Sequence, residues 1–411
     1  MKQVAIVASR SSYRVNAFLE AAKTLRIETH LISDGDFPVG QHRIEICLDD
    51  PVETVKQVTG ELPQVDAIVG VDDESVLAAA EIARAFGLPH NPIDAVAATR
   101  DKAALRQRLA AGGVKQPQFR MAPPGAVLPA AVELGFPVVI KPTGLSASRG
   151  VIRADNPGEA SAAENRVRSI LESADLSPTQ QLLVEQYIPG EEIVVEGLLG
   201  PEGLEVLAVI DKPDPLEGPF FEETLYVTPS RHQPAIQDRA IALVEDAVAA
   251  IGLEIGPVHA EVRITPEGEC YLIEMAARSI GGLCGRALSF GLLGESLEIM
   301  ILRSALGLRS VDVSPTRPAT GVLMLPIPAT GTLTGVAGLD EARQVPGIDE
   351  ITITIPTGRR VEMLPEGDRY LGFVFAGGAD PDSVETSLRQ AGNELAITID
   401  GEEVRPPTSL D

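Results

Sequence analysis

Two glutamates, Glu261 and Glu274, lie in apolar segments on either side of the turn sequence TPEGEC. If residues 267 and 268 form a two-residue hairpin loop, Glu261 lies directly opposite Glu274, and Val262 lies opposite Ile273. This register leaves one face of the hairpin apolar, and a slip of one residue would spoil the separation. The pattern therefore predicts two carboxylates that face each other across a β-ladder.

Facing carboxylates require compensation, because like charges directly opposite each other destabilise a sheet. A divalent cation bound by both Glu261 and Glu274 would supply it. Arg263 or Arg278 could instead neutralise one acid, or the loop could have a different length. In the same register His259 shares the polar face with Glu261. It could sense a substrate or act as a base, or it could only satisfy a local hydrogen bond.

A second candidate is the segment FPVVIKPTGLSASRGVIRA, residues 136–154. A strand is expected to end at Lys141, and a loop of small residues leads to a second strand near Gly150. Backbone N–H groups in such a loop can approach phosphates, and Lys141 adds a positive charge. The loop is neither a P-loop nor a GxGxxG motif. The alternative is a flexible hairpin turn with a surface lysine.

A third candidate is LLVEQYIPGEEIVVEG, residues 182–197. Glu185 closes an apolar strand, and Glu192 begins the next strand after the turn YIPG. Carboxylates placed in this way can accept hydrogen bonds from an adenine amino group or from ribose hydroxyls. They could equally be solvated charges. Lys102, in the helical segment TRDKAALRQRL, carries little information by itself.

These residues must be positioned by a chain of 411 residues, which is long enough for about two to four domains. Residues 1–95 alternate short apolar runs with helical patterns, which is typical of an α/β unit with a parallel sheet. A helix is expected from Ala95 to Gly113, followed by strands, a loop and a helix over residues 136–200. Another helix, AIQDRAIALVEDAVAAIG, leads into residues 256–276. Beyond about residue 310, frequent strand and turn signals predict a separate β-rich domain.

Composition limits the partners. The chain has 34 Lys and Arg against 59 Asp and Glu, a formal net charge of −25. Such a surface repels nucleic acids and anionic membranes unless a local basic pocket overrides it, so neither is expected as a partner. The apolar stretch from Val4 to Ala8 is too short for a signal-peptide core, and we expect a cytoplasmic protein. Cys47, Cys270 and Cys284 form no CxxC motif, and we expect three small buried hydrophobic residues.

The order of the motifs is more specific than any one of them. A helix-start lysine, a strand lysine before a small-residue loop, a V-E-x-Y-I-P-G-x-E turn and two late hairpin acids followed by an arginine together resemble the ATP-grasp superfamily. The resemblance covers about residues 1–330 and is nearest to carboxylate-amine ligases such as the L-amino acid ligases that form dipeptides. It implies an α/β and α+β multidomain chain with the ATP-grasp fold. The implied parts are a Rossmann-like pre-ATP-grasp domain (1–95), a small ATP-grasp subdomain with the linking helix (96–205), a large subdomain with the metal site (206–310) and a β-rich C-terminal domain (311–411).

The resemblance also implies a site for ATP and Mg²⁺ or Mn²⁺. The residues implied to contact the α and β phosphates are Lys102 and Lys141, under a mobile loop that includes Ser148 and Gly150. The residues implied to line the adenine hinge are Glu185, Tyr187 and Ile188. Glu192 is implied to contact the ribose. The residues implied to bind the metal are Glu261 and Glu274.

One position departs from the family pattern. Many ATP-grasp enzymes continue the second metal acid as E-x-N-P-R, but this chain reads Glu274, Met275, Ala276, Ala277, Arg278. A methyl group cannot coordinate a cation. A second Mg²⁺ would therefore rely on Glu274, phosphate and water, or be held more weakly.

Substrate contacts are also implied. Arg278 would hold the substrate carboxylate and later the tetrahedral oxyanion beside the N–H groups of Gly281 and Gly282, unless it only pairs with Glu274. The segment DKPDPLEGPFFEETLYVTPSRH looks like a loop over the acceptor pocket, although an ordinary connection would read similarly. Its candidate substrate contacts are Lys212, Phe220, Glu223 and Arg231.

The predicted function is that of an ATP-dependent carboxylate-amine ligase. ATP would phosphorylate a carboxylate, which we expect to belong to an L-amino acid. A small-molecule amine would then displace phosphate from the acyl phosphate. Arg278 and Glu274 would be the catalytic residues, and a homodimer is expected only by similarity. The alternatives are a biotin-carboxylase-like or purine-pathway ATP-grasp enzyme, and an ATP-binding scaffold without turnover, which Ala276 suggests.

Overall fold

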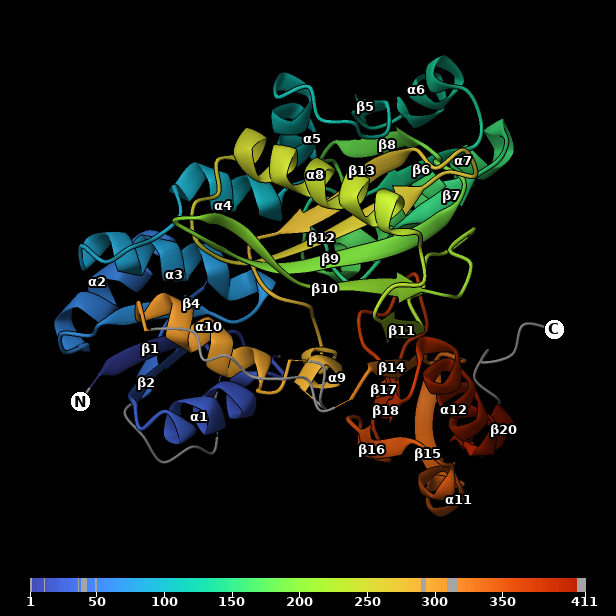
Figure 1. Cartoon of the computed structure of the whole chain (residues 1–411). Helices are drawn as coiled ribbons and strands as arrows, with labels where there is room; N and C mark the ends of the chain where they lie inside the picture. Colours follow the sequence, from blue (N-terminus) through green and yellow to red (C-terminus); the bar gives the residue numbers. More distant parts are fainter. Residues whose placement is uncertain are drawn as a thin grey trace.

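The protein is described from a computed structural model that covers residues 2–10, 12–35, 37, 43–48, 50–289, 293–308 and 317–404. Its parts are a parallel sheet at the N-terminus and antiparallel sheets elsewhere, with helices packed on their faces (Figure 1). The predicted mixture of α/β and α+β architecture is confirmed.

The N-terminal sheet is parallel, with strand order β3-β2-β1-β4. Its strands are β1 (Gln3–Ala8), β2 (Glu28–Ser33), β3 (Arg43–Glu45) and β4 (Ala67–Gly70), and its helices are α1 (Val15–Thr24), α2 (Pro51–Glu61) and α3 (Asp73–Ala85). Continuous apolar runs such as VAIVA form these strands because helices cover both faces of a parallel sheet. Asp72 begins α3 by accepting a hydrogen bond from the Ser75 N–H.

Two helices replace the single helix expected from Ala95 to Gly113. They are α4 (Ile93–Arg100) and α5 (Lys102–Ala111). The break lies at Asp101, whose backbone is extended and whose side chain caps α5 through the Ala104 N–H. Lys102 is therefore the first residue of a helix, as the motif required.

The next sheet has the order β5-β8-β6-β7. Its strands are β5 (Phe119–Ala122), β6 (Val138–Lys141), β7 (Ile152–Ala154) and β8 (Leu182–Gln186), and its helices are α6 (Val127–Leu134) and α7 (Pro157–Ser173). The predicted end of a strand at Lys141 is confirmed.

The largest sheet has the order β13-β12-β9-β10-β11-β14-β18-β16. Its strands are β9 (Glu191–Gly200), β10 (Gly203–Lys212), β11 (Leu225–Thr228), β12 (Gly256–Ile264), β13 (Cys270–Ala276), β14 (Ala319–Leu325), β16 (Ile348–Ile353) and β18 (Gly372–Gly378). The helices between these strands are α8 (Pro234–Ile251), α9 (Gly285–Ser289), α10 (Leu297–Ala305) and α11 (Leu339–Gln344). The sheet runs across the expected boundaries at residues 205 and 310, which remain predictions.

A further sheet completes the C-terminal region, with the order β17-β15-β19-β20. Its strands are β15 (Gly331–Ala337), β17 (Arg360–Val361), β19 (Ala396–Ile399) and β20 (Glu402–Val404), and α12 (Pro381–Glu394) packs on β14 and β18. The strands expected here are present. The helices α11 and α12 were not foreseen, because the strand and turn signals around them are stronger.

The hairpin of β12 and β13 corrects part of the predicted register. Glu261 pairs with Glu274, as expected, but the ladder shifts after Glu261, so that Val262 pairs with Leu272 and not with Ile273. The connection is longer than two residues, because the Thr265 N–H bonds to the Glu269 carbonyl at 2.9 Å. A β-bulge in β13 takes up the difference and keeps the two acids opposite each other.

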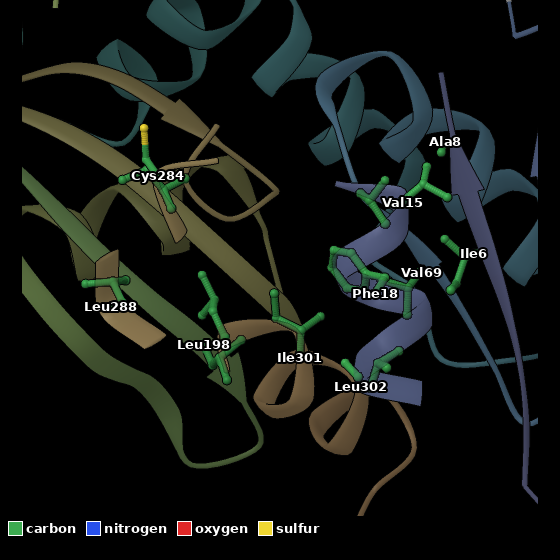
Figure 2. Close-up of a cluster of buried hydrophobic side chains, with 14 of the residues drawn as sticks. Ile6, Ala8, Val15, Phe18, Val69, Leu198, Cys284, Leu288, Ile301 and Leu302 are labelled. Carbon is green, nitrogen blue, oxygen red and sulfur yellow. The ribbon is translucent and has the colours of Figure 1, made fainter. Parts of the chain in front are cut away.

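One hydrophobic core joins regions that are distant in sequence (Figure 2). Phe18 of α1 and Val69 of β4 belong to the same buried cluster as Leu302 of α10 and Phe373 of β18. Because protein interiors are close-packed, this shared core fixes the parallel sheet relative to the largest sheet. The elements that carry the candidate site are therefore held together.

The cysteines differ from expectation at one position. Cys270 and Cys284 are buried, whereas Cys47 is exposed, because it lies just beyond the short edge strand β3. Within the described residues, no helix has the length and apolar character needed to cross a membrane.

Candidate functional site

One cavity of about 1610 Å³, including its open mouth, lies between the β5-β8-β6-β7 sheet and the largest sheet. Most residues predicted for the site line it: Lys102, Lys141, Ser148, Glu185, Tyr187, Ile188, Glu192, Glu223, His259, Glu261, Glu274, Arg278, Gly281 and Gly282. Four predicted residues are not among its lining residues: Gly150, Lys212, Phe220 and Arg231.

Glu261 and Glu274 line this cavity as a facing pair. Lys102 reaches Glu274 from the start of α5, with 3.3 Å between its Nζ and Oε1 of Glu274, and donates a second bond to the Leu145 carbonyl at 2.7 Å. Burial would raise the pKa of Glu261, but Lys212 and His259 outweigh this effect and lower that pKa well below its usual range. Arg263 and Arg278, the two other possible neutralising residues, make their main contacts elsewhere: Arg263 donates to the Ile188 carbonyl and Arg278 pairs with Asp73.

Lys141 is buried and not the surface lysine of the alternative interpretation. Its Nζ lies 2.7 Å from Oε2 of Glu185, while Arg106 donates to the other oxygen at 2.5 Å. Burial would raise the pKa of Glu185, but Arg106 and Lys141 outweigh this effect and lower the pKa to about 2. Glu185 is therefore a buried anion that holds Lys141 in place, not a solvated charge.

The small-residue loop after Lys141 adopts a strained conformation. Ala147 and Ser148 both have positive φ, at 54° and 56°, and such residues persist only where their surroundings fix them. Gly150 has a φ of 72°, and its N–H bonds to the Pro365 carbonyl at 3.0 Å. Arg149 adds a bond from Nε to the Glu366 carbonyl at 2.8 Å. The C-terminal region therefore anchors the loop, and the Gly150 N–H is already engaged.

An apolar part of the cavity lies beside the turn YIPG. Tyr187 and Ile188 are buried there, and Phe221 packs near the ring of Tyr187. The guanidinium of Arg263 lies 5.2 Å from the same ring and donates to the Ile188 carbonyl at 3.1 Å. This part offers flat apolar surface with backbone groups at its edge, which suits a planar heterocycle.

Three carboxylates surround the ammonium of Lys212. Its Nζ lies 2.6 Å from Glu192 and 3.4 Å from Glu261, and it also bonds to Glu223. Oxygens of the three acids lie within 4.8 Å of one another, close enough to hold a metal ion. The Lys212 charge compensates this cluster, and its pKa is raised well above the usual value because the carboxylates outweigh the effect of burial.

His259 is buried and connects two acids. Its Nδ1 lies 2.9 Å from Glu196 and its Nε2 lies 3.7 Å from Glu261. Burial would lower the pKa of His259, but Glu196 and Glu261 outweigh this effect and raise it to about 9. Glu196 also accepts a bond from the Ile280 N–H at 2.9 Å. The histidine therefore positions Glu261 and is tied to the loop after β13.

Arg278 pairs with Asp73, a residue that the sequence analysis missed. The distances from Nε and Nη2 of Arg278 to Asp73 Oδ2 are 2.9 and 2.8 Å. Burial would lower the pKa of Arg278, but Asp73 outweighs this and raises it. The signal was present, since Asp73 follows the carboxyl end of a parallel strand, where ligands commonly bind.

Arg231 lies outside the main cavity. It lines a second hollow, where its guanidinium bonds to Asp211 at 3.0 Å. It also bonds to two residues of α12, Asp382 at 2.9 Å and Glu385 at 2.8 Å. These contacts attach α12 to the largest sheet. The structure therefore gives Arg231 a structural contact in place of the predicted position at the substrate.

Comparisons with protein families agree with this geometry. Residues 134–287 match the ATP-grasp domain, and residues 323–400 match the L-amino acid ligase C-terminal domain 2. The chain contains an ATP-grasp domain, as the order of its motifs predicted. The C-terminal match adds a likeness to L-amino acid ligases that does not depend on the site residues.

Individual proteins extend these matches. An uncharacterised protein of Sinorhizobium fredii is 26% identical over 97% of this chain and 84% of its own length. Alanine–anticapsin ligase of Bacillus subtilis is 28% identical, and the match spans 57% of this chain and about half, 52%, of that ligase. A crystal structure of an L-amino acid ligase from Bacillus licheniformis shares the fold, with a TM-score of 0.81 and 24% identity over 97% of this chain and 99% of that one. The predicted relation to ligases is confirmed.

Proposed function

We propose that this chain is an ATP-dependent carboxylate-amine ligase that joins an L-amino acid to another amino acid or amine. The observation that carries the proposal is the meeting of the facing acids Glu261 and Glu274 with Lys102 and Arg278 in one cavity. Phosphoryl transfer to a carboxylate needs positioning and charge neutralisation, which these residue types provide. The named functions of the L-amino acid ligase and the alanine–anticapsin ligase support the same reaction class.

The nucleotide would occupy the part of the cavity between Tyr187 and the two lysines. Glu261 and Glu274 offer carboxylate oxygens, the ligands that Mg²⁺ prefers, from adjacent strands. These residues fit a magnesium ion, which when bound would neutralise developing charge on the phosphates. Ala276 is buried opposite His259 and contributes no ligand. The metal acids are therefore expected to act without a third side-chain ligand at that position.

In the proposed reaction, a carboxylate oxygen of the acid attacks the γ-phosphorus of ATP. The bond from that phosphorus to the β–γ bridging oxygen breaks, and ADP leaves. The nitrogen of the amine substrate then attacks the acyl carbon, the carbon–oxygen bond to phosphate breaks, and phosphate leaves as the nitrogen loses its proton to solvent. Arg278, Gly281 and Gly282 line the cavity, and their N–H groups would stabilise the tetrahedral oxyanion.

The test is phosphate release from MgATP with the twenty common L-amino acids, singly and in pairs, followed by mass spectrometry. A ligase gives ADP, phosphate and a product with the summed mass of the two substrates minus water. Release of AMP and pyrophosphate would contradict the acyl-phosphate route. A strict requirement for bicarbonate would favour the carboxylating alternative, and MgATP binding with no turnover across amines and acids would favour the scaffold.

A further inference from the structure

Part of the cavity wall is formed by neutral side chains, and we call this part the aromatic subsite. It is lined by Tyr13, Tyr226, Cys284, Met324 and Tyr370. Tyr13 precedes α1 and Tyr370 precedes β18, so its walls come from opposite ends of the chain. The subsite packs on the core around Phe373, whereas Tyr187, beside which the nucleotide base would lie, packs in a different cluster with Phe221.

The two outer tyrosines rest on one buried ring. Phe373 is fully buried, and its centroid lies 6.3 Å from that of Tyr13 and 6.0 Å from that of Tyr370. Both contacts are edge-to-face, a favoured arrangement of aromatic rings. Phe373 also stacks on Phe375 at 6.3 Å. The tyrosine side chains are therefore held at defined positions by the core beneath them.

The floor of the same region is backbone. Gly282 has a φ of 59°, and a Cβ at this position would lie 3.0 Å from the ring of Phe373. Because an L-residue is strained at this φ and would displace the ring, a glycine is required here. The region therefore keeps its width, and its surface consists of aromatic rings, a thioether and a thiol.

Electrostatics disfavour a charged occupant. Burial raises the pKa of Tyr13, Tyr226 and Tyr370, so their hydroxyls stay neutral. The adjacent carboxylate, Glu223, already accepts a bond from the Tyr226 hydroxyl at 2.7 Å and pairs with Lys212. A charged side chain placed there would lose water and would have to compete with these existing contacts of Glu223, which is costly.

We infer, taking the proposed ligase function as given, that one substrate is an L-amino acid with a large uncharged side chain, aromatic or long aliphatic, which packs against Tyr13 and Tyr370. The backbone of that amino acid would remain near Arg278 and the metal acids. Aromatic faces bury much apolar area with defined geometry, and the flexible thioether of Met324 adapts to the remaining shape. Tyr13 and Tyr370 are therefore the specificity-determining residues of this subsite.

The experiment is calorimetric binding of single amino acids to protein saturated with the magnesium complex of a non-hydrolysable ATP analogue, AMPPNP. L-Phe, L-Leu and L-Met are expected to bind at least tenfold more tightly than glycine, L-Asp and L-Lys. Tyr370→Ala and Tyr13→Ala are each expected to weaken L-Phe binding at least tenfold, and Tyr370→Phe to retain it. Tyr271→Ala is the matched control, because this half-buried tyrosine contacts Lys115 and does not line the cavity.

AMPPNP binding separates the possible failures. If AMPPNP binds but charged amino acids or glycine bind best, or both alanine variants bind L-Phe like the wild type, the inference is wrong and the ligase proposal survives. If AMPPNP does not bind to the wild type, the ligase proposal fails and takes the inference with it. A variant that no longer binds AMPPNP has lost its fold. Binding of L-Phe to Tyr370→Leu, which keeps an apolar side chain without the aromatic face, is then measured in its place.

Discussion

Arg278 and Asp73 form a two-pronged ion pair between the loop after β13 and the first turn of α3, with distances of 2.9 and 2.8 Å. The pair joins the parallel sheet to the wall of the candidate site. Asp73, which is 205 positions away in the sequence, therefore orients the guanidinium of Arg278 at the expected reaction centre. Planar guanidinium groups suit such contacts because their donors are fixed in direction.

Asp73→Asn should leave Arg278 charged but poorly oriented. We expect kcat/KM for the carboxylate substrate to fall at least tenfold while the affinity for MgATP changes less than twofold, since Asp73 bonds to Arg278, whereas Lys102 bonds to Glu274 and the Leu145 carbonyl. Steady-state kinetics with each substrate varied in turn provides the measurement. The matched control is Asp94→Asn, an exposed partner of Arg108, which should leave both parameters unchanged. Equal losses for the carboxylate substrate and for MgATP would instead indicate that the whole site has unfolded.

Glu274→Gln should separate nucleotide binding from turnover. The change removes one of the two facing carboxylates and the negative partner of Lys102, but it keeps the size of the side chain. We expect AMPPNP binding within about fivefold of the wild type and a loss of ligation of at least a hundredfold. A rate near that of the wild type would show that Glu274 is not a metal ligand in the reaction.

Glu185→Gln should destabilise the protein in a pH-dependent way. In the folded state the pKa of Glu185 is about 2, below its ordinary value of 4.5, so the carboxylate stabilises the fold above about pH 4.5, and this stability is lost as the pH falls toward 2. The shift corresponds to at most about 3 kcal/mol at neutral pH. Thermal unfolding at pH 7 should show a large difference from the wild type, and the difference should shrink at pH 3. Glu133→Gln should show a much weaker dependence, because its pair with Arg120 is exposed to solvent.

Lys212→Gln tests the compensation of the three-carboxylate cluster. Without the ammonium, Glu192, Glu223 and Glu261 repel one another, and protonation of one of them relieves the repulsion. The raised carboxyl pKa means that the variant loses stability as the pH rises, so its melting temperature should fall further below that of the wild type at pH 8 than at pH 5.5. Lys56→Gln, in an exposed pair with Glu53, serves as the control. A constant difference across this range would contradict the assignment.

Arg149→Ala should loosen the small-residue loop. Arg149 donates to the Glu366 carbonyl and to the Ser173 hydroxyl, and its loss leaves the strained residues Ala147 and Ser148 less constrained. We expect the KM for ATP to rise about fivefold and proteolytic cleavage in the loop to become faster. Arg120→Ala removes an exposed arginine of the same sheet and should change neither property. Unchanged kinetics would show that the loop closes independently of the C-terminal region.

Sequence patterns predicted the acids of the hairpin better than the hairpin itself. The alternation of polar and apolar residues placed Glu261 opposite Glu274 correctly, because side chains on one face of a strand follow a period of two. The bulge and the longer loop were not predictable, since they depend on how the connection packs. The break at Asp101 was predictable in principle from its capping position before Lys102, but the continuous helical pattern on either side concealed it.

The contacts that aim the site residues were beyond the reach of the sequence. Lys141 and Lys102 were recognised as cations, but the partner Glu185 follows from the pairing of β6 with β8, and the partner Glu274 from the approach of α5 to β13. Likewise, no local sequence pattern indicates that Tyr13 and Tyr370 pack on the same ring, that of Phe373. Residue types identify chemistry, whereas long-range packing decides which neighbours each group meets.

The continuity of the largest sheet has a consequence for anyone who wishes to recombine this chain with relatives. Because β14 pairs with β11 on one side and β18 on the other, cutting before β14 would leave β11 with an unpaired row of backbone donors and acceptors. The C-terminal region therefore cannot be exchanged as an independent module. A chimera that keeps β11, β14 and β18 from one parent should stay monodisperse, whereas a crossover between β11 and β14 invites edge-to-edge aggregation.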